Sequence, residues 1–278
     1  MAGRENKEKA TGTAQLIAYM TRTLRNAHGL TQEELGKMCG YSAAAISGVE
    51  TCAQPASDEM LVKLESTIGR DLGFFQESRI HARIEKYPVQ FREYAPLEAS
   101  AVSLSIYSTL VVHGLFQTEE YARALIAGGY PILPADRVEE LVDARTARQQ
   151  IFDREPPATI EYVIEESVLL RKVGDTDVMR GQLQFLATCA QRRNVTVQVL
   201  TMEPRLPGEY AGAYGDMTYV ETPEHEHLIY LEAQEEGMLL SDPTKVSTYA
   251  QRYARIRAQA LDSRESLGLI ERLAGEQP

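Results

Sequence analysis

The stretch that decides the fold of the N-terminal part of the chain is 31–50, TQEELGKMCGYSAAAISGVE. Thr31 can serve as the N-cap of a helix, and Glu34, three residues later, completes a capping box. Gly40 readily adopts the left-handed conformation that ends a helix. Ser42 can then cap a second helix. The stretch therefore predicts two short helices joined by a tight turn.

The sequence on both sides of this pair predicts further helices. Apolar residues recur at helical spacing from Ala14 to Ala27, and Ser57 precedes another segment with the same periodicity. Two short helices joined by a turn and braced by longer helices form a helix-turn-helix, whose second helix enters the major groove of DNA. We therefore expect an all-α N-terminal domain.

The same stretch resembles the signature of the XRE family, the phage Cro- and C1-type repressors. The matching residues are Thr31-Gln32-Glu33-Glu34-Leu35, Gly40-Tyr41-Ser42 and Ile46-Ser47-Gly48-Val49-Glu50. The resemblance implies a DNA-binding domain of five helices that recognises an operator. It also implies which residues face the DNA, at or near the starts of the two short helices: Thr31, Gln32, Ser42, Ala43, Ala44 and Ser47.

The predicted recognition helix departs from the family pattern in its composition. It begins with Ala43, Ala44 and Ala45, and no Lys or Arg lies between Lys37 and Lys63. Alanine can touch a thymine methyl group but cannot make the paired hydrogen bonds by which longer polar side chains distinguish bases. Two hypotheses follow: the domain binds DNA with weak direct readout, or the fold is retained while DNA recognition has been lost.

Charge is unevenly distributed along the chain. The formal net charge is −11, yet residues 1–30 carry five basic and two acidic side chains, whereas residues 81–278 carry 20 basic and 30 acidic ones. Phosphate contacts are made mainly by Lys and Arg. Because most of the negative charge belongs to the second part of the chain, it does not exclude DNA binding by the first.

Composition also bounds the cellular setting. The three cysteines form neither a CxxC pair nor a spaced Cys/His cluster, which argues against a disulfide framework and a structural zinc site. The N-terminus lacks the apolar core of a signal peptide, and the most apolar segment, 101–116, is interrupted by three serines, Thr109 and His113. We expect a cytoplasmic protein without a membrane partner.

The second part of the chain predicts a mixture of helices and strands. Thr118 can cap a helix, and a longer helix is expected over 135–153. Alternating apolar residues predict a strand at 158–166, followed by a helix over 177–191 and three further strands. We therefore predict an α+β chain with three parts: a helix-turn-helix domain at 1–80, a helical linker at 81–110, and at 111–278 a domain of helices flanking a small antiparallel sheet.

This second part resembles the C-terminal domain that accompanies XRE domains in actinobacterial regulators of the WhiJ-like group. The matching segments, in order, are Gly114-Leu115-Phe116-Gln117-Thr118, Glu120-Tyr121-Ala122-Arg123-Ala124, Arg145 with Arg148-Gln149, Val195-Thr196-Val197-Gln198-Val199-Leu200 and Tyr230-Leu231-Glu232. The resemblance implies a regulator paired with a small partner protein encoded nearby, in an antitoxin-like arrangement. His113 and Thr201 stand where the group usually has proline.

A set of polar and aromatic residues forms the candidate site for a ligand or partner: Gln117, Tyr121, Arg145, Gln149, Tyr214, Tyr230 and Glu232. Arg145 and Gln149 fall on an otherwise apolar face of the predicted helix. Tyrosines near the glycine-rich loop at 207–215 can line a mainly apolar pocket while offering hydroxyl groups. The alternatives are that the tyrosines only pack in the sheet and that the arginine stem only covers apolar surface.

No motif predicts catalytic residues, a cofactor or a metal. The sequence contains no GxSxG, no P-loop and no GxGxxG. Glu224-His225-Glu226-His227 offers metal-ligand types, but its position favours a solvated turn. Cys189 falls on an apolar helical face, which favours a core position over a nucleophile.

Three hypotheses follow. The first is a homodimeric regulator that binds an operator and senses a small molecule or partner protein through its C-terminal domain. The second is a repurposed relative whose C-terminal pocket binds or transforms, for example cyclises, a small hydrophobic metabolite, with DNA binding weak or lost. The third is an interaction protein that sequesters a small basic or amphipathic partner through its acidic domain.

Overall fold

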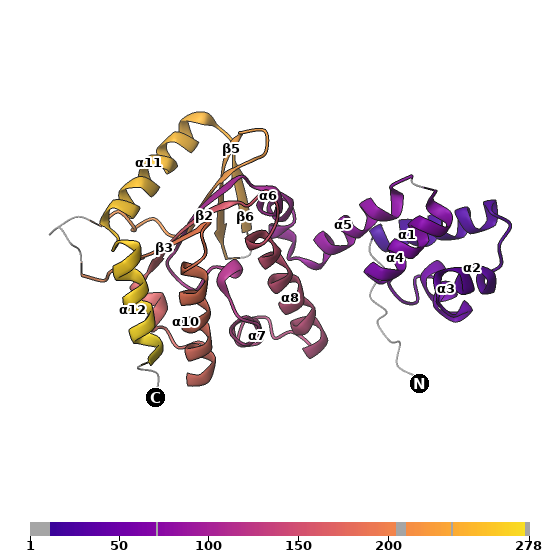
Figure 1. The fold of residues 1–278 in the computed structure, drawn as a ribbon, viewed down its shortest axis with the longest axis horizontal. Coiled ribbons are helices and arrows are strands. Elements are labelled where there is room, and N and C mark those ends of the chain that lie inside the picture. Colours follow the sequence, from indigo (N-terminus) through magenta and orange to yellow (C-terminus); the bar gives the residue numbers. More distant parts are fainter. Residues whose placement is uncertain (1–11, 71, 204–209, 235, 276–278) are drawn as a thin grey trace. The chain divides into compact units, whose positions relative to one another are not determined.

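The computed structural model describes residues 12–70, 72–203, 210–234 and 236–275, and the chain forms two compact units, Met1–Lys86 and Tyr87–Pro278. Figure 1 shows the helices of the first unit and the mixed architecture of the second. The boundary falls inside the segment 81–110, which we expected to be a helical linker. That expectation was wrong, because the segment ends one helix of the first unit and then supplies a helix and a central strand to the second.

Among the described residues, the first unit contains five α-helices and no strand. They are α1 (Gly12–Ala27), α2 (Gln32–Cys39), α3 (Ala43–Glu50), α4 (Asp58–Leu64) and α5 (Phe74–Lys86), with a π-helical turn at Glu65–Gly69. Their apolar faces meet in one core that includes Ile17, Leu35, Ile46, Leu61 and Phe75. The predicted all-α helix-turn-helix architecture is therefore confirmed.

The helix ends lie where the capping residues predict. The Thr31 hydroxyl accepts a hydrogen bond from the Glu34 backbone N–H at 3.2 Å, and the Glu34 carboxylate accepts one from the Thr31 backbone N–H at 2.8 Å. Gly40 ends α2 in the left-handed region, with φ at 78°. The Ser42 hydroxyl accepts from the Ala45 backbone N–H at 3.1 Å and so begins α3.

The tight turn between α2 and α3 depends on Gly36. A Cβ atom at this position would lie 2.6 Å from the carbonyl oxygen of Tyr41, a distance that side chains do not tolerate. The backbone N–H of Tyr41 donates to the Gly36 carbonyl oxygen at 2.8 Å. This hydrogen bond brings the backbone of the turn into the space that a side chain at position 36 would occupy. Glycine inside this short helix therefore allows the close approach that sets α3 against α2.

The second unit is built on a six-stranded sheet in the order β3-β2-β1-β4-β5-β6. The strands are β1 (Ser103–Ser108), β2 (Thr159–Glu165), β3 (Val195–Leu200), β4 (Met217–Glu221), β5 (His227–Ala233) and β6 (Glu236–Leu240). The α+β class is confirmed, but the expected antiparallel sheet is only half correct. β1, β2 and β3 are parallel, and β4, β5 and β6 continue the sheet in antiparallel pairs. Parallel neighbours require long crossovers, which the helices between these strands supply.

Helices cover both faces of this sheet. They are α6 (Tyr94–Ser100), α7 (Glu119–Ala127), α8 (Ala135–Ala147), α9 (Glu166–Leu170), α10 (Thr176–Ala190), α11 (Pro243–Gln259) and α12 (Ser263–Gly275), with short 3-10 turns at Val89–Phe91, Gly114–Phe116 and Arg148–Phe152. The core that contains Leu104 and Ile160 also includes residues of α10 and α12, whereas the core around Tyr107 and Val163 includes residues of α11. Figure 1 shows α11 on one side of the sheet and α10 with α12 on the other.

The central strand β1 was not predicted from the sequence, because three serines interrupt its apolar pattern. Two of these serines are satisfied by carboxylates on the flanking strands: the Ser103 hydroxyl donates to Glu221 at 2.8 Å and the Ser105 hydroxyl donates to Glu161 at 3.4 Å. Leu104, Ile106 and Tyr107 are buried.

No helix in the described part of the chain has the length and apolar character needed to cross a membrane.

Candidate functional site

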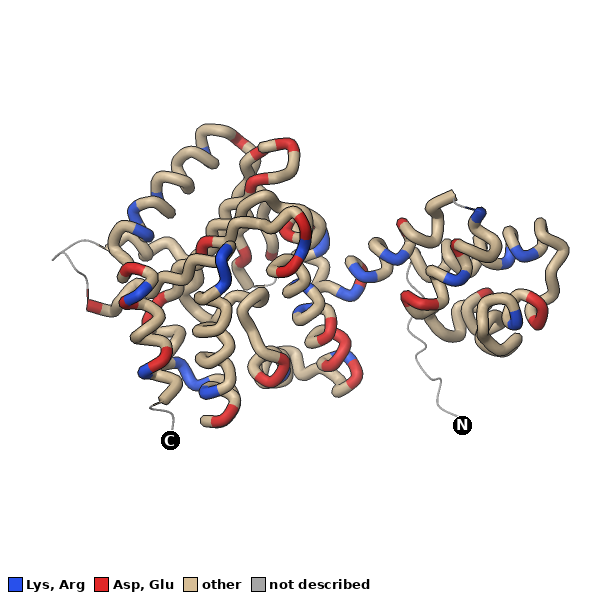
Figure 2. Tube along the Cα trace, viewed as in Figure 1, with Lys and Arg blue, Asp and Glu red and all other residues tan. Residues whose placement is uncertain are grey.

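The residues predicted to face DNA lie along the start of α2 and on the outer side of α3. Ile46, Val49 and Glu50 of α3 are buried, so the opposite side of the helix faces solvent. Ser42 and Ala44 are exposed, and Ala43 and Ser47 are partly exposed. Neither Lys nor Arg occurs on α3, which carries no blue segment in Figure 2. This surface therefore offers small side chains and backbone rather than long polar ones.

Three of the predicted DNA-facing side chains are engaged within the protein. Thr31 and Ser42 cap helices, as described above. The amide nitrogen of Gln32 donates to the buried carboxylate of Glu50 at 2.8 Å. This last contact directs the Gln32 side chain toward the junction of α1, α2 and α3, and it could not be predicted from the sequence because its two residues lie 18 positions apart.

The capping role of Ser42 makes a prediction that separates folding from DNA contact. Ser42→Ala should lower the free energy of unfolding of the first unit by about 1 kcal/mol, because the first turn of α3 loses its side-chain acceptor. Ser47→Ala, on the same helix but not at a cap, should change it by less than about 0.5 kcal/mol. Hydrogen exchange of first-unit peptides in increasing urea measures both values, and equal stability of the two variants would contradict the assignment.

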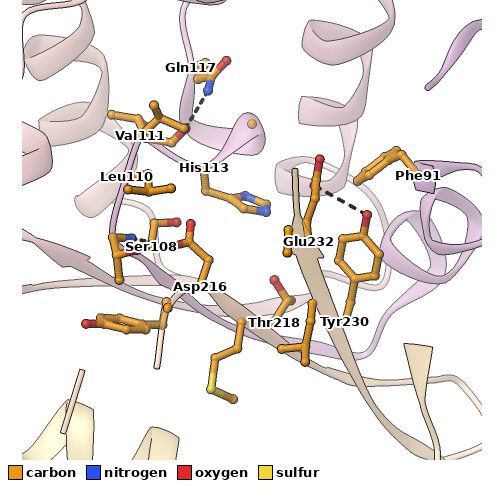
Figure 3. Close-up of a pocket in the computed structure, with 18 of the residues that line it drawn as sticks. Phe91, Ser108, Leu110, Val111, His113, Gln117, Asp216, Thr218, Tyr230 and Glu232 are labelled. Atoms are coloured by element: carbon orange, nitrogen blue, oxygen red, sulfur yellow. Dashed lines mark hydrogen bonds between the residues drawn. The ribbon is translucent and has the colours of Figure 1, made fainter. Parts of the chain in front are cut away.

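The second unit contains a cavity of about 780 Å³ at one edge of the sheet. Its walls come from the loop that follows β1, from the residues that begin β4 and from the end of β5. Figure 3 shows Ser108, His113, Asp216, Thr218 and Glu232 from these segments around the same space. In open α/β sheets, ligands bind beyond the carboxyl ends of parallel strands where successive connections turn in opposite directions. The cavity lies beyond the carboxyl end of the parallel strand β1, and the antiparallel neighbour β4 begins at the same edge.

Five of the seven residues predicted for a ligand or partner line this cavity: Gln117, Arg145, Tyr214, Tyr230 and Glu232. Tyr121 and Gln149 lie behind the wall. The Tyr121 hydroxyl accepts a hydrogen bond from the Val112 backbone N–H at 3.3 Å, and the Gln149 amide donates to the Gln117 carbonyl oxygen at 2.6 Å. Both side chains therefore hold the loop after β1 in place instead of facing the cavity.

Two arginines on the α8 side of the cavity have different partners. The Arg148 guanidinium donates to both carboxylate oxygens of Glu98, at 2.7 and 2.6 Å, and lies 4.2 Å from the centre of the Phe91 ring. Burial acts to lower the pKa of Arg148, but the Glu98 carboxylate outweighs it and the pKa is raised. Arg148 is therefore a neutralised part of the wall. The residues that position it, Glu98 and Phe91, were not identified from the sequence.

Arg145, by contrast, has a neutral partner. Its Nη1 donates to the side-chain oxygen of Gln117 at 3.0 Å, and no ion pair of Arg145 occurs among the described residues. The Gln117 amide nitrogen in turn donates to the Val112 carbonyl oxygen, which fixes the orientation of the amide. Burial and, after it, the charge of Arg148 lower the pKa of Arg145 to about 10, so the guanidinium stays charged at neutral pH.

Three further titratable groups around the cavity have shifted pKa values. Burial, followed by the charges of Arg148 and Arg145, holds the pKa of His113 well below its usual range. Burial raises the pKa of Glu232 against the pull of the two arginines. Burial also raises the pKa of Asp216, although hydrogen bonds from Thr109 oppose the shift. His113 and Asp216 were not predicted as site residues, and only the folded sheet brings them together.

Ser108, His113 and Asp216 are residue types of a hydrolytic triad, but their bonds lead elsewhere. His113 Nδ1 accepts from the Leu115 backbone N–H at 3.4 Å. The Asp216 carboxylate accepts from both the backbone N–H and the hydroxyl of Thr109. Because His113 and Asp216 each bind a separate partner, the three residues do not form the hydrogen-bonded serine–histidine–aspartate triad of serine hydrolases.

A buried carboxylate ties the glycine-rich loop to the sheet. Glu165 accepts hydrogen bonds from the hydroxyls of Tyr107 and Tyr210, the latter at 2.7 Å. A Cβ atom on Gly212 would lie 2.0 Å from the Tyr107 hydroxyl, so glycine is needed for the loop to approach. Glu165 is buried, and the two tyrosine hydroxyls satisfy its carboxylate inside the protein.

The remaining motifs lie outside the cavity. Glu224, His225, Glu226 and His227 are exposed on the turn between β4 and β5, as predicted, and His225 pairs with Glu221 at 2.7 Å. In the part of the chain that the structure describes, no three His, Cys, Asp or Glu residues form a group suited to a metal ion. Cys189 is buried in the core with Met179, Leu183 and Leu186, which confirms its predicted structural role.

The low pKa of His113 predicts acid sensitivity of the second unit. The unfolded chain binds a proton at this histidine below pH 6.5 and the folded chain does not, so the stability conferred by neutral His113 is present above pH 6.5 and is lost as the pH falls. The largest slope from one proton is about 1.4 kcal/mol per pH unit. Asp216 and Glu232, with raised pKa values, act in the opposite direction.

The comparison with His113→Asn isolates this contribution. Urea unfolding of the second unit, followed by hydrogen exchange at pH 7, 6 and 5, should show a stability that falls more steeply toward pH 5 in the unchanged protein than in the variant. Parallel slopes for the two proteins would show that His113 does not keep its low pKa in solution.

The fold and the site define a helix-turn-helix protein with an α+β second unit that encloses a cavity. Comparison with protein families finds one match in each unit. A model described as "Helix-turn-helix" matches residues 22–75, and one described as "Domain of unknown function (DUF5753)" matches residues 91–272. The second match covers most of the chain, which belongs to the DUF5753 family. No curated protein and no solved structure matches the chain.

These matches bear on the resemblances drawn from the sequence. The helix-turn-helix match confirms a DNA-binding regulator of the XRE type at the level of the domain. The resemblance to actinobacterial WhiJ-like regulators stays a prediction, as do the homodimer and the small partner protein.

Proposed function

We propose that this DNA-binding regulator senses a small molecule through the cavity of its second unit. The observation that carries the proposal is the cavity itself, because its volume of about 780 Å³ lies within the range of small-molecule sites. Its walls combine apolar side chains, among them Phe91, Leu141 and Met217, with a few convergent polar groups. This combination is typical of sites that enclose an apolar ligand and orient it by hydrogen bonds.

We propose that the first unit recognises its operator mainly through the DNA backbone and DNA shape. Small residues on the outer side of α3 permit close approach but supply no bidentate base contact. Helix-turn-helix proteins commonly bind two half-sites as dimers, and a homodimer in the cytoplasm fits this mode. A ligand that binds one state of the regulator more tightly would shift its affinity for DNA.

The test is a titration of the full chain against DNA from upstream of its own gene, beside random DNA of equal length, at two salt concentrations. Preference for the upstream fragment, with affinity that falls as salt rises, would support the regulator. Equal and negligible binding to both fragments would contradict autoregulation and favour a repurposed second unit. Repeating the titration with a ligand of the cavity tests sensing, which requires a change in DNA affinity.

A second candidate function is chemical transformation of a small hydrophobic metabolite, such as a cyclisation. The observation that favours it is the presence of three groups with shifted pKa values, His113, Asp216 and Glu232, around one cavity. Incubating the protein with a bound ligand and recovering it for mass spectrometry and chromatography separates the two. A ligand recovered unchanged supports sensing, whereas an isomer formed only with intact His113 and Asp216 supports catalysis.

A further inference from the structure

We infer that the ligand of the cavity is an organic monocarboxylic acid with an apolar body, and that its carboxylate binds Arg145. The inference rests on the proposed small-molecule function and specifies the chemical class of the ligand. It starts from a charge in the cavity wall that the protein does not neutralise.

Arg145 has unused hydrogen-bonding capacity directed at a cavity. A guanidinium presents five N–H donors in a planar fork, and one of them binds the side-chain oxygen of Gln117. Arg148, three residues later, shows how this chain pairs a buried guanidinium when the partner is internal, because Glu98 binds it through both oxygens. A partly buried charge without a partner carries an energetic cost that a bound anion removes.

The nearest acidic group does not fill this role. Glu232 lines the same cavity and its charge acts on Arg145, yet the two side chains form no ion pair within 4 Å. Gln117 also cannot move to pair differently, because its amide nitrogen and backbone oxygen are both bonded, to Val112 and Gln149. The fixed oxygen of Gln117 therefore restrains Nη1 of Arg145 before a ligand arrives.

The surrounding charges favour a single negative charge on the ligand. Asp216 and Glu232 are both part of the cavity wall, so a phosphate or a dicarboxylate would bring repulsion that one arginine cannot offset. A carboxylate matches the planar fork of a guanidinium through two parallel hydrogen bonds. The apolar remainder of the ligand would lie against Phe91, Leu110 and Val111.

A third arginine in the cavity wall, Arg252, provides a matched control. Arg252 lies over the rings of Tyr214 and Tyr249, 4.3 and 4.7 Å from their centres, so its flat faces are occupied by aromatic contacts. If any cationic side chain in the cavity sufficed, Arg252 would serve as well as Arg145. The inference requires that it does not.

The experiment measures binding of three acids, decanoic, naphthalene-1-acetic and biphenyl-4-carboxylic acid, each beside its methyl ester, by calorimetry on the full chain. At least one acid should bind about tenfold or more tightly than its ester, and Arg145→Met should weaken that acid about 10- to 100-fold while leaving the ester unchanged. Arg252→Met and Arg180→Met, the latter outside the cavity wall, should change acid affinity by less than about threefold. Arg145→Lys should give an intermediate affinity and replaces the methionine variant if that one does not fold.

The outcomes separate this inference from the proposed function. Esters that bind as tightly as their acids, or acid binding that depends on Arg252 and not on Arg145, would overturn the carboxylate assignment while leaving a small-molecule site. If neither acids nor esters bind while the neutral apolar probe N-phenyl-1-naphthylamine does, the carboxylate assignment fails and the small-molecule site stands; if this probe does not bind either, the sensing proposal fails and the inference falls with it.

Discussion

Glu98→Ala is expected to lower the free energy of unfolding of the second unit by about 3–5 kcal/mol, the cost of breaking a buried ion pair by removing one partner. The Glu98 and Arg148 side chains are only 2% and 10% exposed, and two hydrogen bonds join them. Without Glu98, the largely buried guanidinium of Arg148 keeps its charge but loses both of its carboxylate hydrogen bonds. Hydrogen exchange of second-unit peptides in increasing urea measures the change.

Two further variants test the cause of this loss. Asp153→Ala removes the partner of Arg192 from a pair whose carboxylate is 73% exposed, and should cost less than about 1 kcal/mol. The double variant Glu98→Leu with Arg148→Met removes both charges and should be more stable than Glu98→Ala, because no unpaired charge is left. If the double variant is as unstable as Glu98→Ala, the loss of stability comes mainly from lost packing against Phe91 and not from the unpaired charge of Arg148.

Local signals predicted the helices better than the sheet. Helix ends depend on residues close in sequence, and the caps at Thr31, Ser42, Ser57 and Thr118 all lie where the pattern placed them. Strand β1 depends on partners 56 and 118 residues away, because carboxylates on β2 and β4 satisfy two of its serines. No pattern within 101–116 contains that information. The parallel order of β1, β2 and β3 is likewise set by crossover packing.

In the candidate site, too, some residues could be predicted from local sequence and others depend on partners far away in the chain. Arg145 and Gln149 were identified because polar residues on an apolar helical face are unusual, and Arg145 does line the cavity. His113 and Asp216 lie about a hundred positions apart in sequence and meet only through the pairing of β1 with β4. The role of Glu98 could not be predicted from the sequence. A single acidic residue in a short helix is common, and only the structure shows that Arg148 is its partner. The sequence therefore identified cavity residues on the α8 side and on the β4–β5 side, whereas the sheet topology was needed to place His113 and Asp216 beside them.

Glu50→Ala is expected to lower the free energy of unfolding of the first unit by about 3–5 kcal/mol and to abolish DNA binding. The Glu50 side chain is 1% exposed and accepts hydrogen bonds from Arg25 of α1, at 2.5 and 3.1 Å, and from Gln32 of α2. Burial acts to raise the pKa of Glu50, but the bonds from Arg25 and Gln32 outweigh it and the pKa is lowered. One carboxylate therefore holds three helices together at the base of the recognition helix.

Hydrogen exchange of first-unit peptides in urea, together with DNA titration at a temperature where the variant is folded, checks both parts of this expectation. Glu33→Ala is the matched control, because it removes an exposed carboxylate from α2 whose partner Lys37 is also exposed, and should cost less than about 0.5 kcal/mol. Gln32→Met tests the link to function: it frees Glu50 of one bond but leaves Arg25 in place. If Gln32 acts only through Glu50, this variant should lose stability and DNA affinity in proportion; DNA affinity lost at unchanged stability would instead assign Gln32 to the DNA surface, as the family resemblance implies.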